Sequence, residues 1–186
     1  GALAAAQALG ADLALSAHAL SQWRPVGGRG VVERIELDPD RPDAALTLID
    51  DAYNANPTSL GAAFDVLTQS TTHGRRIAFV GDMKELGPKE REMHGAMAEH
   101  PAMAQIDLVH CVGPLMETLH HALPAEKQGQ HCDTSEAMAP HLRALLQAGD
   151  TILVKGSLSM DMARIVTGIK DLGWRVPETA QQQGTG

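Results

Sequence analysis

The chain has 186 residues, of which 44% are hydrophobic and 20% charged, so it is long enough to bury a core. Its formal net charge of −8 argues against a general nucleic-acid-binding protein, because neutralising phosphates requires clustered Lys and Arg. Two cysteines, Cys111 and Cys132, are too few for a disulfide framework. No apolar run is long enough to span a membrane, and no signal-peptide pattern is present. These features predict a cytoplasmic protein that does not insert into membranes.

The start of the chain predicts two short helices, over residues 2–9 and 12–21, because Ala, Leu and Gln favour helix. The segment 23–30 contains one Pro and three Gly, which break regular structure, and it is interpreted as a domain boundary. The chain opens without Met directly in an Ala-rich helical pattern. The two helices are therefore interpreted as the end of a larger domain.

Beyond residue 30, short β-prone runs alternate with helical stretches. Strands are predicted over residues 31–37, 45–50, 76–80, 108–112, 130–132 and 151–155. Helices are predicted over residues 57–69, 89–99, 115–122, 134–147 and 159–172. This alternation predicts an α/β fold, with a mostly parallel sheet of about six strands flanked by helices. The polar segment 177–186 is predicted to be a disordered tail.

Polar residues and glycines follow the ends of the main predicted strands. They form the segments Asp50–Pro57, Gly81–Pro88, Gly113–Pro114 and Lys155–Ser157. The carboxyl ends of parallel strands lie along one edge, where open α/β sheets bind their ligands. The sequence therefore predicts a composite site, built from loops that are distant in the chain.

Residue chemistry alone leaves two interpretations open for each loop. Asp and Asn in the segment 50–57 can bind ribose hydroxyls and an adenine edge, but they more often serve as capping and turn residues. The segment 81–88 can position a substrate or simply connect a strand to a helix. Lys155 can meet an anion or be solvated at a strand end. It does not belong to a P-loop, because Ile152–Val154 precede it in place of a Gly-rich loop.

The nine histidines include the pairs His110–Cys111, His120–His121 and His131–Cys132. Adjacent residues on a strand point to opposite faces, so such a pair is poorly arranged to hold one ion. No metal site is predicted from them.

Four segments resemble, in order and spacing, the motifs of the Mur ligase family of cell-wall enzymes. Residues 50–59 (DDAYNANPTS) resemble D-D-x-Y-N-A-N-P-x-S, and residues 81–87 (GDMKELG) resemble G-D-M-x-E-L-G, with His94 where the family carries a His. Residues 152–160 (ILVKGSLSM) resemble L-V-K-G-S-R-S-M, and residues 25–29 (PVGGR) resemble the hinge P-x-x-G-R. The fit extends from about residue 2 to 172. The version of the first motif is similar to that of the branch that joins D-alanyl-D-alanine to UDP-N-acetylmuramoyl-tripeptide.

The resemblance implies a monomeric, cytoplasmic enzyme of three domains. Residues 1–26 would be the last helices of the central ATPase domain and the hinge, and residues 27–176 the C-terminal domain, with a dinucleotide-binding-like fold. ATP would phosphorylate the tripeptide carboxylate, and the amine of D-alanyl-D-alanine would attack the acyl phosphate. The P-loop and Mg²⁺ would belong mainly to the central domain, so this chain alone is expected to be inactive.

The resemblance also implies roles for individual residues, although it places no catalytic residue in this fragment. ATP would be bound by Arg29 at the hinge, by Asp51 at the ribose, and by Asn54 and Asn56 at the adenine. The peptide substrates would be bound by Lys155, Ser157 and Asp82.

Leu158 stands where the family usually has Arg, so no anion contact is assigned there. Two alternatives stay open: another ligase of the same superfamily with a different amino acceptor, and a nucleotide-binding domain without catalysis of its own.

Overall fold

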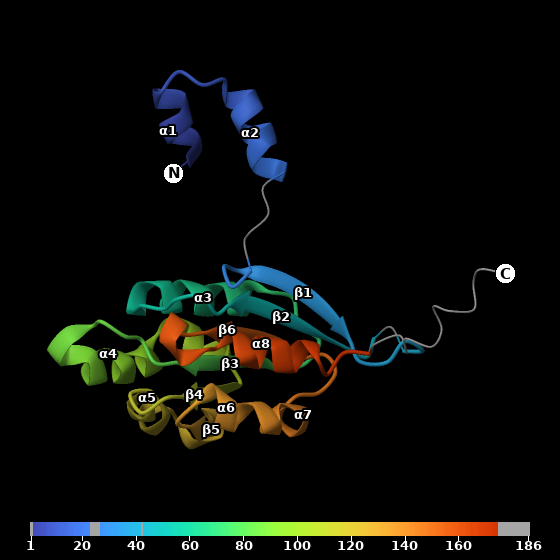
Figure 1. The fold of residues 1–186 in the computed structure, drawn as a ribbon, viewed down its shortest axis with the longest axis vertical. Coiled ribbons are helices and arrows are strands. Elements are labelled where there is room, and N and C mark those ends of the chain that lie inside the picture. Colours follow the sequence, from blue (N-terminus) through green and yellow to red (C-terminus); the bar gives the residue numbers. More distant parts are fainter. Residues whose placement is uncertain (1, 23–26, 42, 175–186) are drawn as a thin grey trace.

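The computed structural model describes residues 2–22, 27–41 and 43–174, and its centre is a six-stranded sheet (Figure 1). The strands lie in the order β1-β2-β6-β3-β4-β5. Their bounds are β1 Val31–Glu36, β2 Ala45–Asp51, β3 Arg76–Gly81, β4 Leu108–Val112, β5 Gln128–Cys132 and β6 Thr151–Lys155. All six predicted strands are therefore present, with ends within two residues of the predicted ones.

The sheet is mostly parallel, as the sequence predicts. β2, β6, β3, β4 and β5 pair in parallel, and β1 alone pairs antiparallel, with β2. Val31, which begins β1, is opposite Asp50 near the end of β2. The antiparallel direction of β1 therefore brings the segment before it to the carboxyl edge of the sheet.

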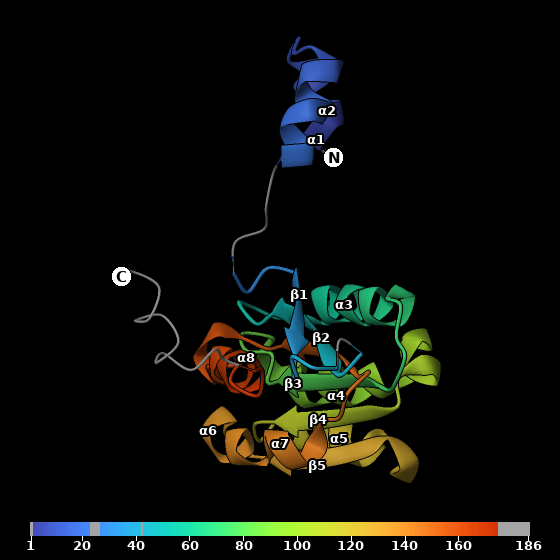
Figure 2. The same ribbon diagram turned by 90° about the vertical axis from the view of Figure 1, so that its right-hand side faces the viewer.

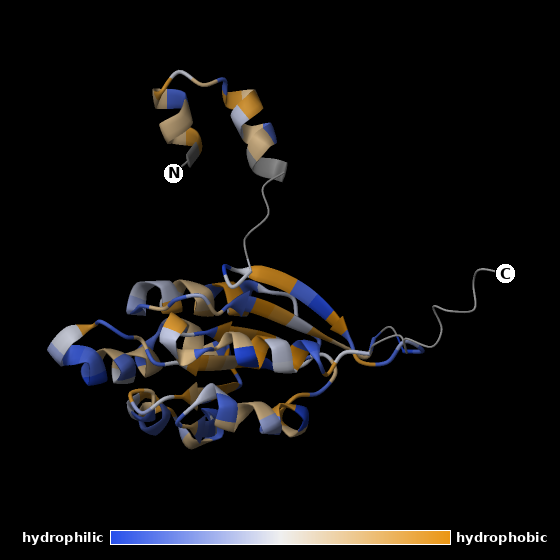
Figure 3. Cartoon of the chain, in the orientation of Figure 1, coloured by the Kyte–Doolittle hydropathy of each residue, from blue (hydrophilic) through white to orange (hydrophobic). Residues whose placement is uncertain are grey.

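Helices cover both faces of the sheet. The covering helices are α3 Pro57–Gln69, α4 Glu90–Ala96, α5 Glu117–Ala122, α6 Ser135–Met138, α7 Leu142–Leu145 and α8 Ala163–Lys170. Two further helices, α1 Ala2–Ala8 and α2 Leu13–Gln22, precede the sheet in the chain. In Figure 2, α3 lies on one side of the sheet and α8 on the other. The strands between them are mainly hydrophobic (Figure 3), which agrees with a sheet buried on both faces.

Each face of the sheet has its own hydrophobic cluster, because successive side chains of a strand point to opposite faces. On β3, Ala78 and Val80 join the cluster under α3 and α5, whereas Ile77 and Phe79 join the cluster under α6, α7 and α8. Phe64 and Phe79, one in each cluster, are fully buried. This double packing holds the strand ends, and the loops that follow them, in fixed relative positions.

Three predicted helices are divided or shortened by several residues, and the predicted helix 115–122 begins two residues late, as α5. The predicted helix 134–147 is divided into α6, a 3₁₀ turn η5 (Ala139–His141) and α7, because Pro140 lacks the N–H that a continuous helix requires. The predicted helix 159–172 begins only at Ala163, since Asp161 has a left-handed backbone with φ of 48°. The predicted helix 89–99 is α4, preceded by η1 (Gly87–Lys89) and followed by η2 (Met97–Glu99).

The two N-terminal helices pack against each other and stand apart from the sheet in both views (Figures 1 and 2). Apolar side chains are exposed in this part of the chain: Leu9, which directly follows α1, is 88% exposed, and Leu15 on α2 is 71% exposed. The predicted hinge proline, Pro25, and the predicted tail, 177–186, lie outside the described residues. Among the described residues, no helix is both long and apolar enough to cross a membrane.

Candidate functional site

The loops predicted to form a composite site do meet at one edge of the sheet. The strand register places Asp51 of β2 and Val80 of β3 on either side of Lys155, the last residue of β6. Gly81 is paired with Val112 at the end of β4. The parallel order therefore aligns four strand ends, and the loops after β2, β3 and β6, with the segment before β1, surround two adjoining hollows.

The first hollow encloses about 410 Å³ beside the ends of β2 and β6. It brings together five residues predicted from the sequence and five that were not: Arg29, Asp51, Asn54, Asn56 and Lys155, with Gly28, Tyr53, Ala55, Ser59 and Ala62. All four residues predicted to bind ATP thus line one hollow.

Arg29 is held at the rim of the first hollow by an aromatic ring. Its guanidinium carbon lies 4.0 Å from the ring centroid of Tyr53, a cation–π contact. The backbone of Gly28 supports this contact, because its carbonyl accepts the Tyr53 N–H at 3.0 Å and its N–H donates to Asp50 Oδ2 at 3.1 Å. Gly28 has a φ of 77°, a conformation that favours glycine. No ligand contact was predicted for Tyr53, the only tyrosine of the chain.

Lys155 is buried rather than solvated. It is 3% exposed, and its Nζ donates to Asp51 Oδ2 at 2.5 Å and to the Asn54 carbonyl at 2.9 Å. These contacts tie the end of β6 to the loop after β2. The structure therefore places Lys155 on the first hollow, with the residues predicted for the nucleotide, although it was predicted to face the peptide substrate.

The two asparagines of this loop differ in how their side chains are engaged. Asn56 caps α3: its Oδ1 accepts the Ser59 N–H at 2.8 Å, and Ser59 Oγ accepts the Asn56 N–H at 3.0 Å. The capping interpretation is therefore right for Asn56. Asn54 is exposed, and among the described residues its Oδ1 accepts only the adjoining Ala55 N–H, at 2.8 Å. Asn54 is the freer of the two to meet a ligand.

The second hollow encloses about 610 Å³ on the other side of the same loop. It is lined by three residues shared with the first hollow and by the loops after β3 and β6: Asn54, Ala55, Asn56, Lys84, Glu85, Leu86, Ser157, Leu158 and Ser159. Ser157, predicted for the peptide substrate, joins the two strand loops, because its Oγ accepts the Lys84 N–H at 2.8 Å. Leu158 is 65% exposed at this hollow.

Asp82 does not line either hollow, because it is completely buried behind them. Its Oδ1 accepts the N–H groups of Leu115 and Met116 at 3.0 and 2.9 Å, and its Oδ2 accepts from Lys84 Nζ at 2.8 Å. A Cβ on Gly113, whose φ is 110°, would overlap the Asp82 carboxyl group. Any part that Asp82 takes in substrate binding therefore acts through the loops that it joins.

His94 was noted only for its place in a motif, but it contacts the loop after β3 directly. It is fully buried on α4, and its Nε2 accepts the Met83 N–H at 2.9 Å. Only the tertiary structure reveals this contact, which crosses eleven residues of sequence.

The carboxylates at this edge do not form a magnesium site among the described residues. Magnesium prefers oxygen ligands, but Asp50 accepts from two backbone N–H groups, Asp51 pairs with Lys155, and Asp82 is engaged as above. In the part of the chain that the structure describes, no three His, Cys, Asp or Glu side chains converge as a metal site would require.

The two cysteines are poor nucleophiles. Burial, followed by the charge of Asp82, raises the pKa of the Cys111 thiol to about 12, and burial also raises the pKa of Cys132. Both cysteines are free thiols.

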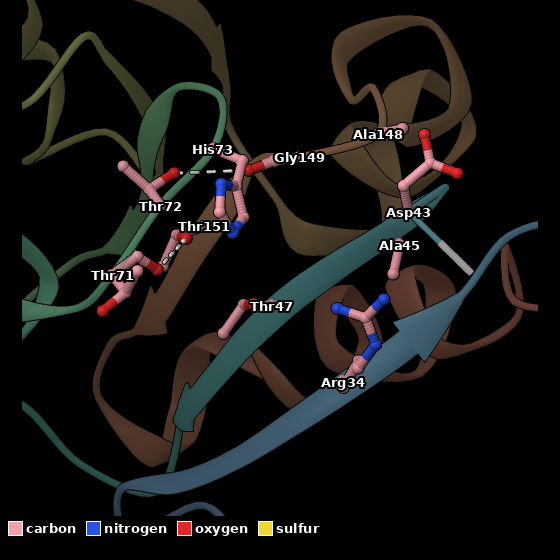
Figure 4. A pocket seen from close by; sticks show the side chains of 10 residues that line it. All are labelled: Arg34, Asp43, Ala45, Thr47, Thr71, Thr72, His73, Ala148, Gly149 and Thr151. Carbon is pink, nitrogen blue, oxygen red and sulfur yellow. Dashed lines mark hydrogen bonds between the residues drawn. The ribbon is translucent and has the colours of Figure 1, made fainter. Parts of the chain in front are cut away.

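A further hollow, of about 480 Å³, lies at the opposite end of the strands (Figure 4). Its lining residues come from β1, β2 and β6 and from three connecting segments, and Thr72 Oγ1 donates to the Gly149 carbonyl at 3.2 Å. None of the residues predicted from the sequence to bind a ligand lines it. The predicted chemistry therefore gathers at the carboxyl edge.

Comparison with known families identifies the domain type. The family described as "Mur ligase, glutamate ligase domain" matches residues 33–158, more than half of the chain. This match includes most of the residues that line the two hollows, in the loops after β2, β3 and β6, but not Gly28, Arg29 and Ser159.

Comparison with individual proteins gives the same result. The chain is 34% identical over 174 residues to the UDP-N-acetylmuramoyl-tripeptide–D-alanyl-D-alanine ligase of Escherichia coli K12, covering 92% of this chain and 36% of the relative. The Bacillus subtilis 168 ligase of the same name is 33% identical over 149 residues, covering 76% of this chain and 31% of the relative. The chain thus spans about a third of the length of these relatives.

Solved structures show the same arrangement. A crystal structure of MurF from Acinetobacter baumannii superposes with a TM-score of 0.75 at 26% identity, covering 91% of this chain and 35% of that one. MurF ligase from Thermotoga maritima, solved in complex with ADP, superposes with a TM-score of 0.69 at 24% identity, covering 91% and 36%.

Proposed function

The chain belongs to the Mur ligase family, and we propose that it acts as the C-terminal domain of an ATP-dependent ligase that adds D-alanyl-D-alanine to UDP-N-acetylmuramoyl-tripeptide, a step of peptidoglycan precursor synthesis. Its relatives carry the same domain as about a third of their length. The whole ligase then consists of this domain and of others that precede it.

The observation that carries the proposal is the meeting of the family motifs around two adjoining hollows. The first hollow contains Arg29 and Asp51 of two motifs, and the second contains Ser157 of a third and Lys84 of a fourth. The segment 54–56 separates the two hollows and lines both. Such a partition suits a reaction in which a nucleotide and a peptide must be held side by side.

The first hollow has the chemistry of a nucleotide site. The Arg29 guanidinium can pair with phosphate oxygens, and the Asp51 carboxylate can accept hydrogen bonds from ribose hydroxyls. The exposed Asn54 amide can meet an adenine edge, and Asn56 contributes mainly by capping α3. The ADP in the Thermotoga maritima relative agrees with nucleotide use at this fold.

The second hollow is assigned to the peptide substrates. Lys84 and Ser157 offer an ammonium and a hydroxyl, and the loops that carry them are joined through the buried Asp82. Leu158 adds an exposed apolar side chain in place of the Arg usual in the family, so it can pack against a methyl group but cannot pair with a carboxylate.

This domain contributes binding and orientation to the reaction. The terminal phosphoryl group of ATP is transferred to the tripeptide carboxylate, which gives an acyl phosphate and releases ADP. The dipeptide amine then attacks the acyl carbon, and the tetrahedral intermediate expels phosphate and loses a proton to leave the amide. The P-loop and the magnesium ion are assigned to the preceding domain, as the family resemblance implies. Asp51 and Asp82 of this chain are engaged with internal donors, which is consistent with that assignment. Closing the two hollows over the reactants would exclude water from the acyl phosphate, which water would otherwise hydrolyse.

The N-terminal helices fit the same proposal. α1 and α2 are assigned to the end of the preceding domain, because exposed leucines such as Leu9 and Leu15 would be covered there. The free thiols Cys111 and Cys132 suit the reducing cytoplasm, where this ligase would act. Its monomeric state stays a prediction.

The test is phosphate release by the full-length ligase polypeptide with ATP, Mg²⁺ and UDP-N-acetylmuramoyl-tripeptide, with and without D-alanyl-D-alanine. Release that requires the dipeptide is expected. Phosphate release that does not require the dipeptide but requires another amine would identify a related ligase with a different amino acceptor. ATP-dependent ligation by the 186-residue chain alone would overturn the division of roles between domains.

A further inference from the structure

The loop between β3 and η1 is held in place through three consecutive backbone N–H groups, each bonded to a different element. The Asp82 N–H donates to the Val112 carbonyl at 3.0 Å, at the end of β4. The Met83 N–H donates to His94 Nε2 on α4 at 2.9 Å, and the Lys84 N–H donates to Ser157 Oγ after β6 at 2.8 Å. The position of this loop is therefore determined from three directions.

The middle contact specifies the state of the His94 ring. The Met83 N–H can only donate, so Nε2 must be the acceptor and carries no proton. The other nitrogen, Nδ1, then carries the proton and donates to the Glu90 carbonyl one turn earlier in α4, at 2.6 Å. The ring is neutral and has both nitrogens satisfied, which is the arrangement that a fully buried histidine requires.

The loop that His94 holds carries three of the residues that line the second hollow, among them Lys84 and Glu85. Lys84 and Glu85 follow Met83 directly and line that hollow, whereas His94 is buried behind them and lines neither hollow. Glu85 has a left-handed backbone with φ of 64°, so the loop adopts a conformation that its own residues do not favour. A loop of this kind persists only when the surrounding structure holds it.

We propose that His94 is a positioning residue of the ligase: it accepts the Met83 N–H and thereby places Lys84 and Glu85 at the peptide-substrate hollow. This deepens the proposed function and rests on it. His94 acts on the second hollow and not on the first, because no residue of the segment 83–86 lines the first hollow.

Two amide variants separate the two hydrogen bonds of His94. In His94→Gln, the amide oxygen sits on Cδ, one bond beyond Cγ, like Nε2 of the ring, so it can still accept the Met83 N–H. In His94→Asn, the amide sits on Cγ, like Nδ1, so it can donate to the Glu90 carbonyl but does not reach Met83. Both variants are polar and neither titrates. The exposed His141→Asn serves as a matched surface control.

The first measurement is hydrogen exchange of the Met83 amide, followed by NMR in the 186-residue chain. His94→Asn should speed exchange at this amide by roughly five- to a hundredfold, the range that corresponds to the cost of an unpaired buried N–H. His94→Gln should change it much less. This readout does not depend on any ligase activity, so it tests the contact even if the proposed function fails.

The second measurement is steady-state kinetics of the full-length ligase. For His94→Asn we expect KM for the tripeptide or the dipeptide to rise about tenfold or more, with KM for ATP nearly unchanged, and we expect His94→Gln to restore most of the loss. Thermal denaturation of each variant provides the stability comparison.

The positioning role would be refuted if His94→Asn and His94→Gln had equal KM values for the peptide substrates. It would also be refuted if the KM for ATP rose together with the KM for the peptide substrates in His94→Asn. A wild-type enzyme that requires no dipeptide would refute the proposed function instead, and the exchange result would still stand.

Discussion

A fall in pH should destabilise this domain through one buried histidine, His110. It lies on β4, 2% exposed and stacked on Phe79 with 4.5 Å between ring centroids. Its Nδ1 accepts the Gln130 N–H at 2.8 Å, so the proton is on Nε2, which is buried and has no hydrogen-bond partner among the described residues. Burial, and then the charges of Arg75 and His120, lowers the pKa of His110 from 6.5 to about 4.

The sign and size of the effect follow from this shift. Because the folded pKa lies below the unfolded one, the unfolded chain binds more protons between these values, and protonation favours unfolding. The stability is fully present above pH 6.5 and is lost as the pH falls towards 4. The whole shift corresponds to about 3 kcal/mol, of which about 2 kcal/mol is lost between pH 7 and pH 5.

The assay is urea denaturation of the 186-residue chain at pH 7 and pH 5, for the wild type and for His110→Asn. The Asn oxygen sits where Nδ1 was and can accept the Gln130 N–H, but it does not titrate. The variant is less stable at both pH values because of the smaller side chain. From pH 7 to pH 5, the free energy of unfolding of the wild type should nevertheless fall by about 2 kcal/mol more than that of the variant. An equal loss in both proteins, or an NMR titration of His110 near pH 6.5, would refute the reasoning.

Three further changes test the carboxyl edge. Gly113→Ala should destabilise the chain by more than about 2 kcal/mol in thermal denaturation, because the new Cβ would overlap Asp82 and φ is positive. Lys155→Met should cost about 2 kcal/mol in urea denaturation, because it leaves the 26%-exposed Asp51 carboxylate without its ammonium partner. Arg29→Gln should raise the Kd of the full-length ligase for ATP about tenfold in calorimetry, because it removes a cation from the first hollow.

Each change has a control at a site with similar chemistry. Gly87 also has a positive φ, but a Cβ there meets no atom within 4 Å, so Gly87→Ala should cost only about 1 kcal/mol. Lys89→Met removes an ion pair that is 69% and 72% exposed and should change stability by less than about 0.5 kcal/mol. Tyr53→Phe keeps the ring beneath Arg29 and should leave ATP binding unchanged. If a control substitution changed stability or ATP binding as much as the test substitution it is paired with, the structural reason given for that test substitution would be wrong.

The strands were predictable because their signal is local. Apolar runs such as those of β3 and β6 end abruptly in Gly or polar residues, and these changes of composition are read directly from neighbouring positions. Helix ends were less predictable. Pro140 could have indicated the break between α6 and α7, but the late start of α8 depends on the left-handed backbone of Asp161.

The sequence predicted which residues form the candidate site better than it predicted the contacts that these residues make. The ATP-binding residues predicted from the family motifs, among them Arg29 and Asn54, share one hollow, since parallel strands end at the same edge. Their environments did not follow from the motifs. Lys155 follows three apolar residues at the end of a strand, and its pairing with Asp51 crosses 104 residues of sequence. Asp82 likewise bonds to groups more than thirty residues away.

The sequence by itself determined the α/β class, the positions of six strands and the edge at which the polar loops gather, because hydrophobic periodicity and turn residues act over a few neighbouring positions. Only the tertiary structure decided that β6 lies between β2 and β3 and that β1 runs antiparallel, since both depend on pairing between distant segments. For the same reason it alone decided that Asp82 is buried, and that His94 holds the loop at the second hollow.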